Sequence, residues 1–250
     1  MTDKYARFAK LGFDDFREMA RDSSLSRYEK IGFPDEYRKG KEHLIFEDIL
    51  KKIPALEQND KVVLDIGPGC SDLAHYLIEH SKAHKHQLIL VDSEEMLNLL
   101  PNSDLIRKEA VYYPNCPELL EELHGMIDVI ICYSVFHYVF EESNTWGFID
   151  HSLSLLAPGG HLLIGDIPNV SKRKRFFASE TGIQHHKNFM ETSDPPVVNF
   201  NQVESSSIDD SVMLAVVMRA RLAGFDAYLV SQGDELPMAN RREDILIVRP

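Results

Sequence analysis

Short apolar runs alternate with stretches of helical spacing along most of the chain. Residues 62–66 are apolar except for Asp65, and the run is too short for a helix, so it predicts a buried strand. The chain then turns at Gly67-Pro-Gly69, and helical spacing resumes from Leu73 to Glu79. A strand, a glycine turn and a helix in this order are typical of a nucleotide-binding corner. Glycines let the backbone approach a ligand, and free N–H groups at the helix start face it.

The same alternation continues toward the C-terminus and predicts a largely parallel sheet. We expect further strands at residues 87–92, 104–110, 127–134 and 161–166. A helix over 146–156 should stop in a turn at 156–160. The capping-box spacing at 207–210 predicts another helix, which ends at Gly224, and the strands 227–230 and 245–248 follow as a terminal pair.

The first 55 residues precede this alternation and predict a helical cap. Helices are expected over 14–22 and 35–52, the second burying Phe46, Ile49, Leu50 and Ile53. Gly40 would cost about 1 kcal/mol inside a helix, so the second helix should begin or bend there. The predicted division is therefore a cap at 1–55 and a core at 56–250, with an insertion at about 168–207.

Composition narrows the class of protein. Apolar residues make up 44% of the 250 residues and charged residues 27%, as in a globular protein of one α/β domain. The chain has no apolar run of the ~20 residues that a membrane span needs, and its first residues lack a signal-peptide core. Three scattered cysteines indicate reduced thiols, and a net charge of −13 opposes nucleic-acid binding. We expect a cytoplasmic protein that acts without a membrane or nucleic acid; the oligomeric state stays open.

Two acids narrow the choice of nucleotide. The third glycine of a dinucleotide fingerprint would fall on Asp72, an anion unsuited to a pyrophosphate. Asp65 ends the first strand, where a carboxylate suits a ligand with positive charge. S-adenosylmethionine has an ammonium and a sulfonium and lacks phosphate. Asp92 ends the second strand, where an acid accepts hydrogen bonds from a ribose diol in either cofactor class.

The segment Leu64-Asp-Ile-Gly-Pro-Gly69 resembles the first motif of the class I S-adenosylmethionine-dependent methyltransferases. The family usually has a further glycine where this chain has Ser71, a residue that can cap the following helix. The resemblance extends over about residues 60–250. It implies a Rossmann-like three-layer sandwich whose seven-stranded sheet is mostly parallel, with an antiparallel last strand.

The resemblance also implies a set of cofactor residues. Asp65 would meet the cationic amino-acid end, Asp92 the ribose, and Glu109 the adenine amino group. Met96 would pack against adenine or fill the core, and Arg38 would face the cofactor carboxylate. The whole predicted set is Asp65, Gly67, Gly69, Asp92, Ser93, Met96, Glu109, Ala110, Tyr133, Ser134 and Arg38.

The candidate catalytic residues are His137 and Tyr138, which follow the fourth strand. Either could serve as a base or a substrate contact, while His137 could instead orient a loop or sit in the core. The basic run 172–175 is a solvated face or attracts an anionic substrate. The predicted substrate residues are Tyr28, Tyr37, Asp166, Arg173, Arg175, His185 and His186.

One pair of histidines has the spacing of metal ligands. His80 and His84 are four residues apart, but lysines are interleaved with them and no acid or cysteine is near in sequence. A solvated turn is the expected structure, and no metal is predicted.

The sequence therefore predicts a methyltransferase that uses S-adenosylmethionine, with S-adenosylhomocysteine as the product. The acceptor would be an oxygen or nitrogen of a small anionic metabolite, phosphorylated or linked to a nucleotide or sugar. Two alternatives stay open: an NAD-dependent oxidoreductase of related fold, and a catalytically silent S-adenosylmethionine-binding protein.

Overall fold

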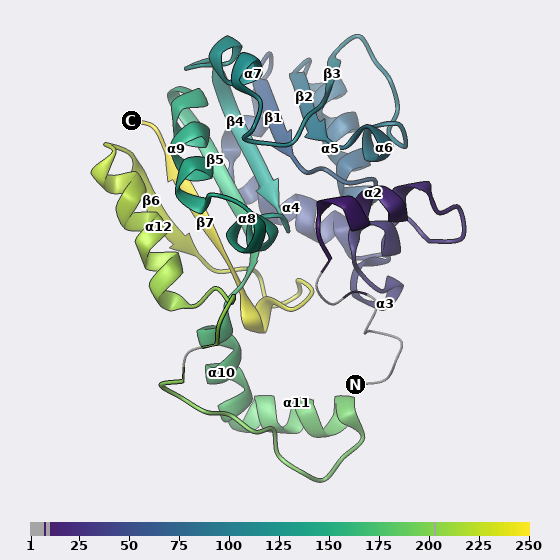
Figure 1. Ribbon diagram of the computed structural model, residues 1–250, viewed down its shortest axis with the longest axis vertical. Helices are drawn as coiled ribbons and strands as arrows, with labels where there is room; N and C mark the ends of the chain where they lie inside the picture. Colours follow the sequence, from purple (N-terminus) through teal and green to yellow (C-terminus); the bar gives the residue numbers. More distant parts are fainter. Residues whose placement is uncertain (1–7, 9–10, 203) are drawn as a thin grey trace.

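A seven-stranded sheet forms the centre of the protein (Figure 1). The computed structural model describes residues 8, 11–202 and 204–250. The strand order is β3-β2-β1-β4-β5-β7-β6, and only β7 runs against its neighbours. The predicted fold class is thereby confirmed. The strands are β1 (Val62–Ile66), β2 (Gln87–Asp92), β3 (Ile106–Ala110), β4 (Ile127–Tyr133), β5 (Leu156–Pro168), β6 (Asp226–Val230) and β7 (Arg242–Val248).

Helices cover both faces of the sheet, because successive strand side chains point to opposite sides. Leu64 and Ile66 of β1 belong to the apolar cluster on one face, while Val63 belongs to the cluster on the other. The first face packs against α7 (Pro117–Glu122), α8 (Phe136–Glu142), α9 (Thr145–Leu155) and α12 (Asp210–Leu222). The second packs against α2 (Phe13–Arg21), α4 (Glu42–Lys52), α5 (Asp72–Ala83) and α6 (Glu94–Leu97).

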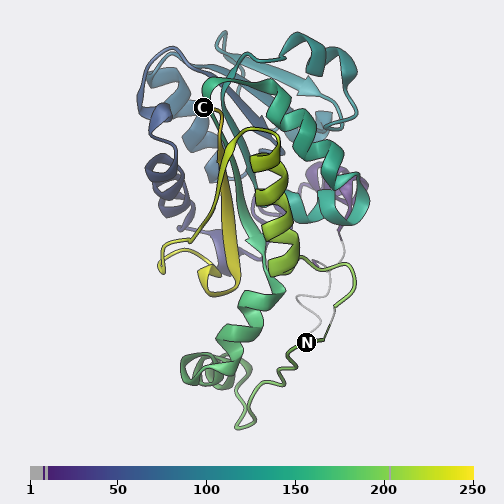
Figure 2. The same ribbon diagram turned by 90° about the vertical axis from the view of Figure 1, so that its left-hand side faces the viewer.

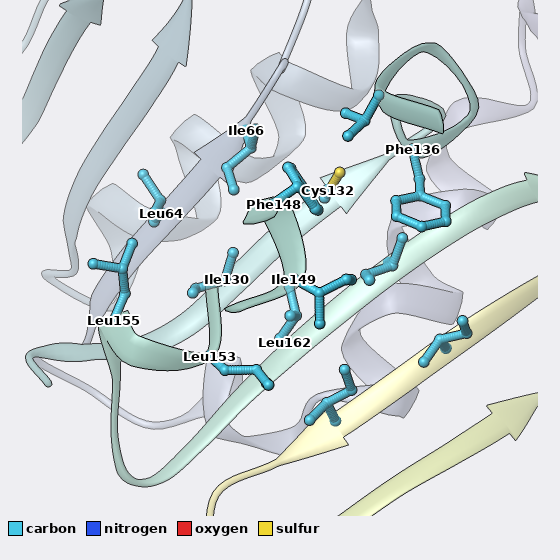
Figure 3. Packing of buried hydrophobic residues seen from close by; sticks show 14 of the residues in the cluster. Leu64, Ile66, Ile130, Cys132, Phe136, Phe148, Ile149, Leu153, Leu155 and Leu162 are labelled. Atoms are coloured by element: carbon cyan, nitrogen blue, oxygen red, sulfur yellow. The ribbon is translucent and has the colours of Figure 1, made fainter. Parts of the chain in front are cut away.

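Figure 3 shows the first of these clusters, in which α8 and α9 place aromatic rings over the central strands. Phe136 and Phe148 are at most 1% exposed, and their ring centroids lie 5.9 Å apart. Ile130 of β4 and Leu162 of β5 are fully buried in the same cluster. This packing holds the carboxyl ends of the parallel strands in fixed relative positions.

The N-terminal segment forms a helical layer, which we call the N-terminal layer (residues 11–57). It contains α2, η1 (Glu29–Ile31), α3 (Asp35–Arg38), α4 and η2 (Pro54–Glu57). The helix predicted over 35–52 is interrupted at Gly40, which adopts a φ of +73° that favours glycine. Ile49 and Ile53 are buried as predicted, whereas Phe46 and Leu50 are only partly buried.

Two local predictions were wrong. The expected turn at 156–160 lies within β5, because Leu156 already pairs with Ile127 of β4 and the register shifts before His161. The last long helix begins at Asp210, and Asp209 rather than Ser207 caps it by accepting bonds from two backbone N–H groups.

The predicted insertion contains α10 (Val170–Ala178) and α11 (Glu180–Met190), which extend away from the end of the sheet (Figures 1 and 2). Beyond α11, the chain returns to α12 without regular structure in its described residues. Within the described ranges, the helices are too short or too polar to cross a membrane.

Candidate cofactor site

A cavity of about 1010 Å³, part of it open to solvent, lies where β1, β2 and β4 end. The carboxyl ends of neighbouring parallel strands are the usual place for a ligand in such sheets. The glycine turn after β1 and the residues after β4 form its inner walls, and the N-terminal layer covers it. Its aromatic lining residues are Phe13, Phe16, Phe33, Tyr112, Tyr113, Tyr133 and Tyr138.

The glycine turn lets the backbone come close to this cavity. Gly67 and Gly69 have φ angles of +71° and +61°, in the left-handed region. A Cβ atom on Gly67 would lie 2.6 Å from Val135, and one on Gly69 would lie 2.5 Å from Ile31 of the N-terminal layer. A side chain at either position would therefore displace a cavity wall.

Asp92 lies on the cavity at the end of β2. Its carboxylate accepts bonds from the backbone N–H groups of Ser93, at 2.6 Å, and of Gly69, at 3.0 Å. Burial raises the pKa of Asp92 to about 6, against the lowering effect of these two donors. The carboxylate is thus held in place by the glycine turn and remains ionised above pH 6.

Asp65 does not border this cavity, although it lies near the carboxyl end of β1. Strand alternation points it to the face under α4 and α5, where it borders a separate cavity of about 310 Å³ with Phe46, Leu77 and Tyr133. Burial, and then the charge of Asp92, raise the pKa of Asp65 to about 8. Asp65 is therefore absent from the lining of the larger cavity and lies behind the glycine turn.

Glu42 of α4 lies beside the N-terminus of α5 and was not predicted as a site residue. Ser71 occupies the N-cap position but makes no side-chain cap bond, so the expected serine cap was wrong. Glu42 of α4 takes that role, since its Oε2 accepts the N–H of Leu73 at 2.8 Å. Glu42 is 2% exposed and borders the cavity. Acids are common in the first turn of a helix, so the sequence does not mark Glu42 as a residue that borders a cavity.

Asp166, at the end of β5, binds two guanidinium groups. Its Oδ2 accepts bonds from Arg38, at 2.7 Å, and Arg242, at 2.9 Å, and the Ser134 hydroxyl also donates to it. Arg38 donates to Ser134 as well, at 2.6 Å. Burial alone would raise the pKa of Asp166, but Arg242 and Arg38 lower it below its usual value. The pair of Arg38 and Asp166 is almost completely buried, at 2% and 3% exposure.

Strain accompanies this cluster. Ser134 and Asp166 have φ angles of +61° and +58°, which are rare for residues other than glycine. Such conformations cost about 1–3 kcal/mol each and concentrate at functional sites. Both residues stand at the carboxyl ends of central strands, Ser134 on the cavity and Asp166 behind it.

The other predicted cofactor residues divide into two groups. Met96, Tyr133 and Ser134 line the cavity. Ser93 lies beside it as the cap of α6, while Glu109 pairs with Arg107 and neither it nor Ala110 borders the cavity. Residues 111–113 form the wall beyond β3 instead.

The two candidate catalytic residues border different cavities. Tyr138 lines the cofactor cavity, and His137 lines a second cavity of about 680 Å³ beside the insertion. Burial raises the pKa of Tyr138 to about 12. Burial, with Arg242, lowers the pKa of His137 to about 3. Near neutral pH, Tyr138 is therefore protonated and His137 is an uncharged imidazole.

The predicted substrate residues are dispersed. Arg173 borders the second cavity but pairs with Glu204, and Arg175 pairs with Asp210. Tyr28 donates to Asp72, and Tyr37 lies near Arg241, whose pKa it affects. His185 and His186 lie on α11 beside aromatic rings and border neither cavity.

A third histidine joins the pair at the end of α5. Nitrogens of His80, His84 and His86 lie within 4.8 Å of one another. His86 nevertheless accepts the N–H of Lys61 with Nδ1 and contacts the Leu56 carbonyl with Nε2, so both of its nitrogens are engaged. His80 contacts the same carbonyl. These bonds join the end of α5 to the start of β1. The expected turn is present at 84–85, where Lys85 is exposed, whereas His80 lies within α5.

Part of the chain that forms this site matches a known protein family. Residues 64–162, from β1 into β5, match the family model described as a methyltransferase domain. Over these residues, the chain is similar to a methyltransferase domain. The match ends before the insertion and leaves out the N-terminal layer, so Glu42 and Arg38 lie outside it.

Solved structures of methyltransferases are similar to this chain in fold. The chain is similar to the CurJ carbon methyltransferase, with a TM-score of 0.56 and 14% identity over 95% of this chain and 64% of that one. It is similar to the plantazolicin methyltransferase BpumL, with a TM-score of 0.56 and 12% identity over 100% and 99%. It is also similar to the N-methyltransferase NodS from Bradyrhizobium japonicum WM9. The TM-score is 0.53, and the identity is 11% over 95% of this chain and 98% of that one. A comparison with curated proteins finds no match.

The buried cluster around Asp166 should stabilise the fold. Replacing Asp166 by Asn leaves two guanidinium groups without a counter-charge, and we expect a loss of about 3–5 kcal/mol in the free energy of unfolding. Because its pKa is lowered, the contribution of Asp166 is present above the usual carboxyl pKa and lost as the pH falls below it. Urea denaturation at pH 7 measures the loss. Asp150→Asn, which breaks an exposed pair with Arg219, is the control and should cost less than about 1 kcal/mol. Equal effects of the two substitutions would contradict the prediction.

Proposed function

We propose that this chain is an S-adenosylmethionine-dependent methyltransferase that binds its cofactor in the cavity at the ends of β1, β2 and β4. The charge of the cavity carries the proposal. Three acids line it, Glu42, Asp92 and Glu142, whereas Arg38 is the only cation among its described lining residues and is paired with Asp166. A sulfonium and an ammonium complement this lining, and a pyrophosphate would be repelled by it.

The adenosine part of the cofactor fits the wall formed by β2 and β3. Asp92 would accept the ribose hydroxyls while the glycine turn holds its carboxylate. Met96, Val111 and Tyr112 supply apolar surface for the adenine. Asp65 would act from behind Gly67, adding negative potential toward the cationic end of the cofactor.

The N-terminal layer would act as a lid over this site, with the boundary near residue 55. Phe13, Phe16 and Ile31 from the layer line the cavity directly. Arg17 pairs with Glu95 of α6, and Tyr28 donates to Asp72 of α5. These contacts close the layer onto the cofactor side of the core.

The acceptor would be a small anionic metabolite bound in the second cavity. Arg241 and Arg242 border this cavity, and the Nε of Arg241 is buried without a hydrogen-bond partner among the described residues. The Nδ1 of His137 is buried and unpaired in the same way. The basic run contributes less than its composition suggests, because Arg173 and Arg175 are paired with acids of the same chain.

Little acid–base chemistry is required of the chain. The sulfonium activates the methyl group, so the protein mainly has to hold a nucleophile in line with it. With pKa values of about 3 and about 12, His137 and Tyr138 are suited to hydrogen bonding rather than to proton removal. An oxygen or nitrogen acceptor that ionises easily meets this limit, which favours the anionic class.

Ligand binding separates this function from its alternatives. S-adenosylhomocysteine should raise the melting temperature and NAD should not, because only the first complements an acidic cavity. Thermal unfolding with each ligand at equal concentration measures this. A shift with NAD alone would favour the oxidoreductase alternative. Methyl transfer to a panel of small phosphorylated and carboxylated acceptors then separates an enzyme from a silent binder.

Asp92→Ala should weaken S-adenosylhomocysteine binding by about 10- to 150-fold, the equivalent of 1.5–3 kcal/mol for bonds to a charged acceptor. Because ribose hydroxyls donate to the ionised carboxylate, affinity of the unmodified protein should also fall as the pH drops below about 6. Calorimetry between pH 5 and pH 8 tests both. Unchanged affinity, or the same fall in the alanine variant, would remove Asp92 from the ribose site.

Arg241→Gln should raise the Michaelis constant for an anionic acceptor about tenfold while leaving S-adenosylhomocysteine affinity unchanged, because Arg241 borders only the second cavity. Steady-state kinetics with the acceptor found by the panel measure the effect. Arg219→Gln, on the surface beside Asp150, is the control. The same constant in Arg241→Gln and the control would contradict an anionic acceptor at this place.

A further inference from the structure

One helix at the surface carries an apolar outer face. α12 buries one side against the sheet, and its opposite side carries Leu214, Met218 and Leu222, which are 53%, 53% and 84% exposed. These residues are spaced four positions apart, so they form one line along the helix. A surface helix normally carries charged and polar residues on the side away from the core. The outer side of α12 therefore differs from an ordinary solvated helix face.

Two small residues share this outer side. Ser211 and Ala215 precede Met218 and Leu222 by seven positions, or about two turns, and so lie on the same side of the helix. If a second copy of α12 ran antiparallel, centred near the middle of the helix, Ala215 would oppose Met218 of the other copy. Ser211 would likewise oppose Leu222. Large side chains would then pack over small ones, and the face would be self-complementary, as a two-fold contact requires.

The charges of α12 favour the same antiparallel arrangement. Its first turn contains Asp210, whose side chain pairs with Arg175 yet stays 44% exposed. Its last turn contains the bases Arg219 and Arg221. Asp210 and Arg221 are eleven positions, or about three turns, apart and so lie on one flank of the helix. Antiparallel pairing places the acidic end of each copy beside the basic end of the other, and the two helix dipoles are then favourably opposed.

Exposed aromatic rings border this side of the helix. The Cζ of Arg219 lies 5.4 Å from the ring centroid of Trp146 in α9, and that of Arg221 lies 5.9 Å from the ring centroid of Tyr228 in β6. Aromatic residues and arginine are enriched in protein interfaces. The whole surface, which we call the α12 face, consists of Ser211, Leu214, Ala215, Met218, Leu222, Trp146 and Tyr228.

We propose that the α12 face binds a second copy of this chain, with the two α12 helices antiparallel across a two-fold axis. Figure 2 faces α12, and no other element covers it there. A membrane surface matches less well, because anionic headgroups would repel a chain of net charge −13. The described lining residues of the cofactor cavity and the second cavity include none from α12, so neither cavity is part of the contact. The inference does not depend on the proposed function.

The oligomeric state of the whole chain tests this inference. Sedimentation equilibrium from about 1 µM to about 100 µM should show a reversible dimer. Met218→Glu places a charge within the contact, and we expect it to weaken the dimer at least about tenfold. Met126→Glu makes the same substitution at a similarly exposed methionine outside the α12 face and should leave the dimer unchanged. Thermal unfolding verifies that each variant keeps its fold.

A pair of opposite charges tests the antiparallel arrangement. Met218→Lys should weaken the dimer as Met218→Glu does. An equimolar mixture of the two variants should dimerise again, because their side chains would lie close together across the axis and attract each other. A mixture that stays monomeric would overturn this arrangement.

Three results would overturn the α12 face as a dimer contact. The first is an unmodified chain that is monomeric at every concentration, which would leave the face to a different partner. The second is a dimer that Met218→Glu does not weaken, and the third is a dimer that Met126→Glu weakens equally. Should Met218→Glu not fold, Leu222→Glu at the exposed end of the helix replaces it, with the same expected loss.

Discussion

The carboxylate of Asp166 joins the N-terminal layer to the sheet through buried ion pairs. It accepts bonds from Arg38 of α3 and Arg242 of β7, and the Ser134 hydroxyl at the end of β4 completes the cluster. The network continues through Asp244, which accepts the Asp166 N–H and also binds Lys52 of α4. Buried charges are tolerated only when they are matched in this way. Arg38 can therefore lie against the cavity only because Asp166 is fixed beneath it.

The same cluster separates two spaces. Arg38 lines the cofactor cavity and Arg242 lines the second one, and both bind one carboxylate oxygen. Tyr138 and His137 divide in the same way, although they are adjacent in the chain and their rings lie 3.9 Å apart. Under the proposed function, the acceptor must reach the methyl group directly, because the reacting atoms have to be in contact. The side chains of this partition would therefore have to move apart when both ligands are bound.

Features that depend on neighbouring residues could be predicted from sequence. The five residues of β1, the glycine turn and the acid that ends β2 follow from apolar spacing and turn chemistry. Features that depend on distant segments could not. Glu42 acquires its role from a backbone N–H 31 positions away, and Arg175 is neutralised by an acid 35 positions away. Asp65 is intermediate, since its strand was evident but the face it takes depends on which helices cover the sheet.

The cover over the cavity has a kinetic consequence. Aromatic rings of the N-terminal layer lie on the cavity, and the T-shaped contact of Phe16 with Tyr138, at 5.0 Å, joins the layer to α8. If the layer closes fully over a bound nucleoside, it has to move again before the nucleoside leaves. Departure of the spent cofactor, rather than the methyl transfer itself, would then set the pace of each catalytic cycle.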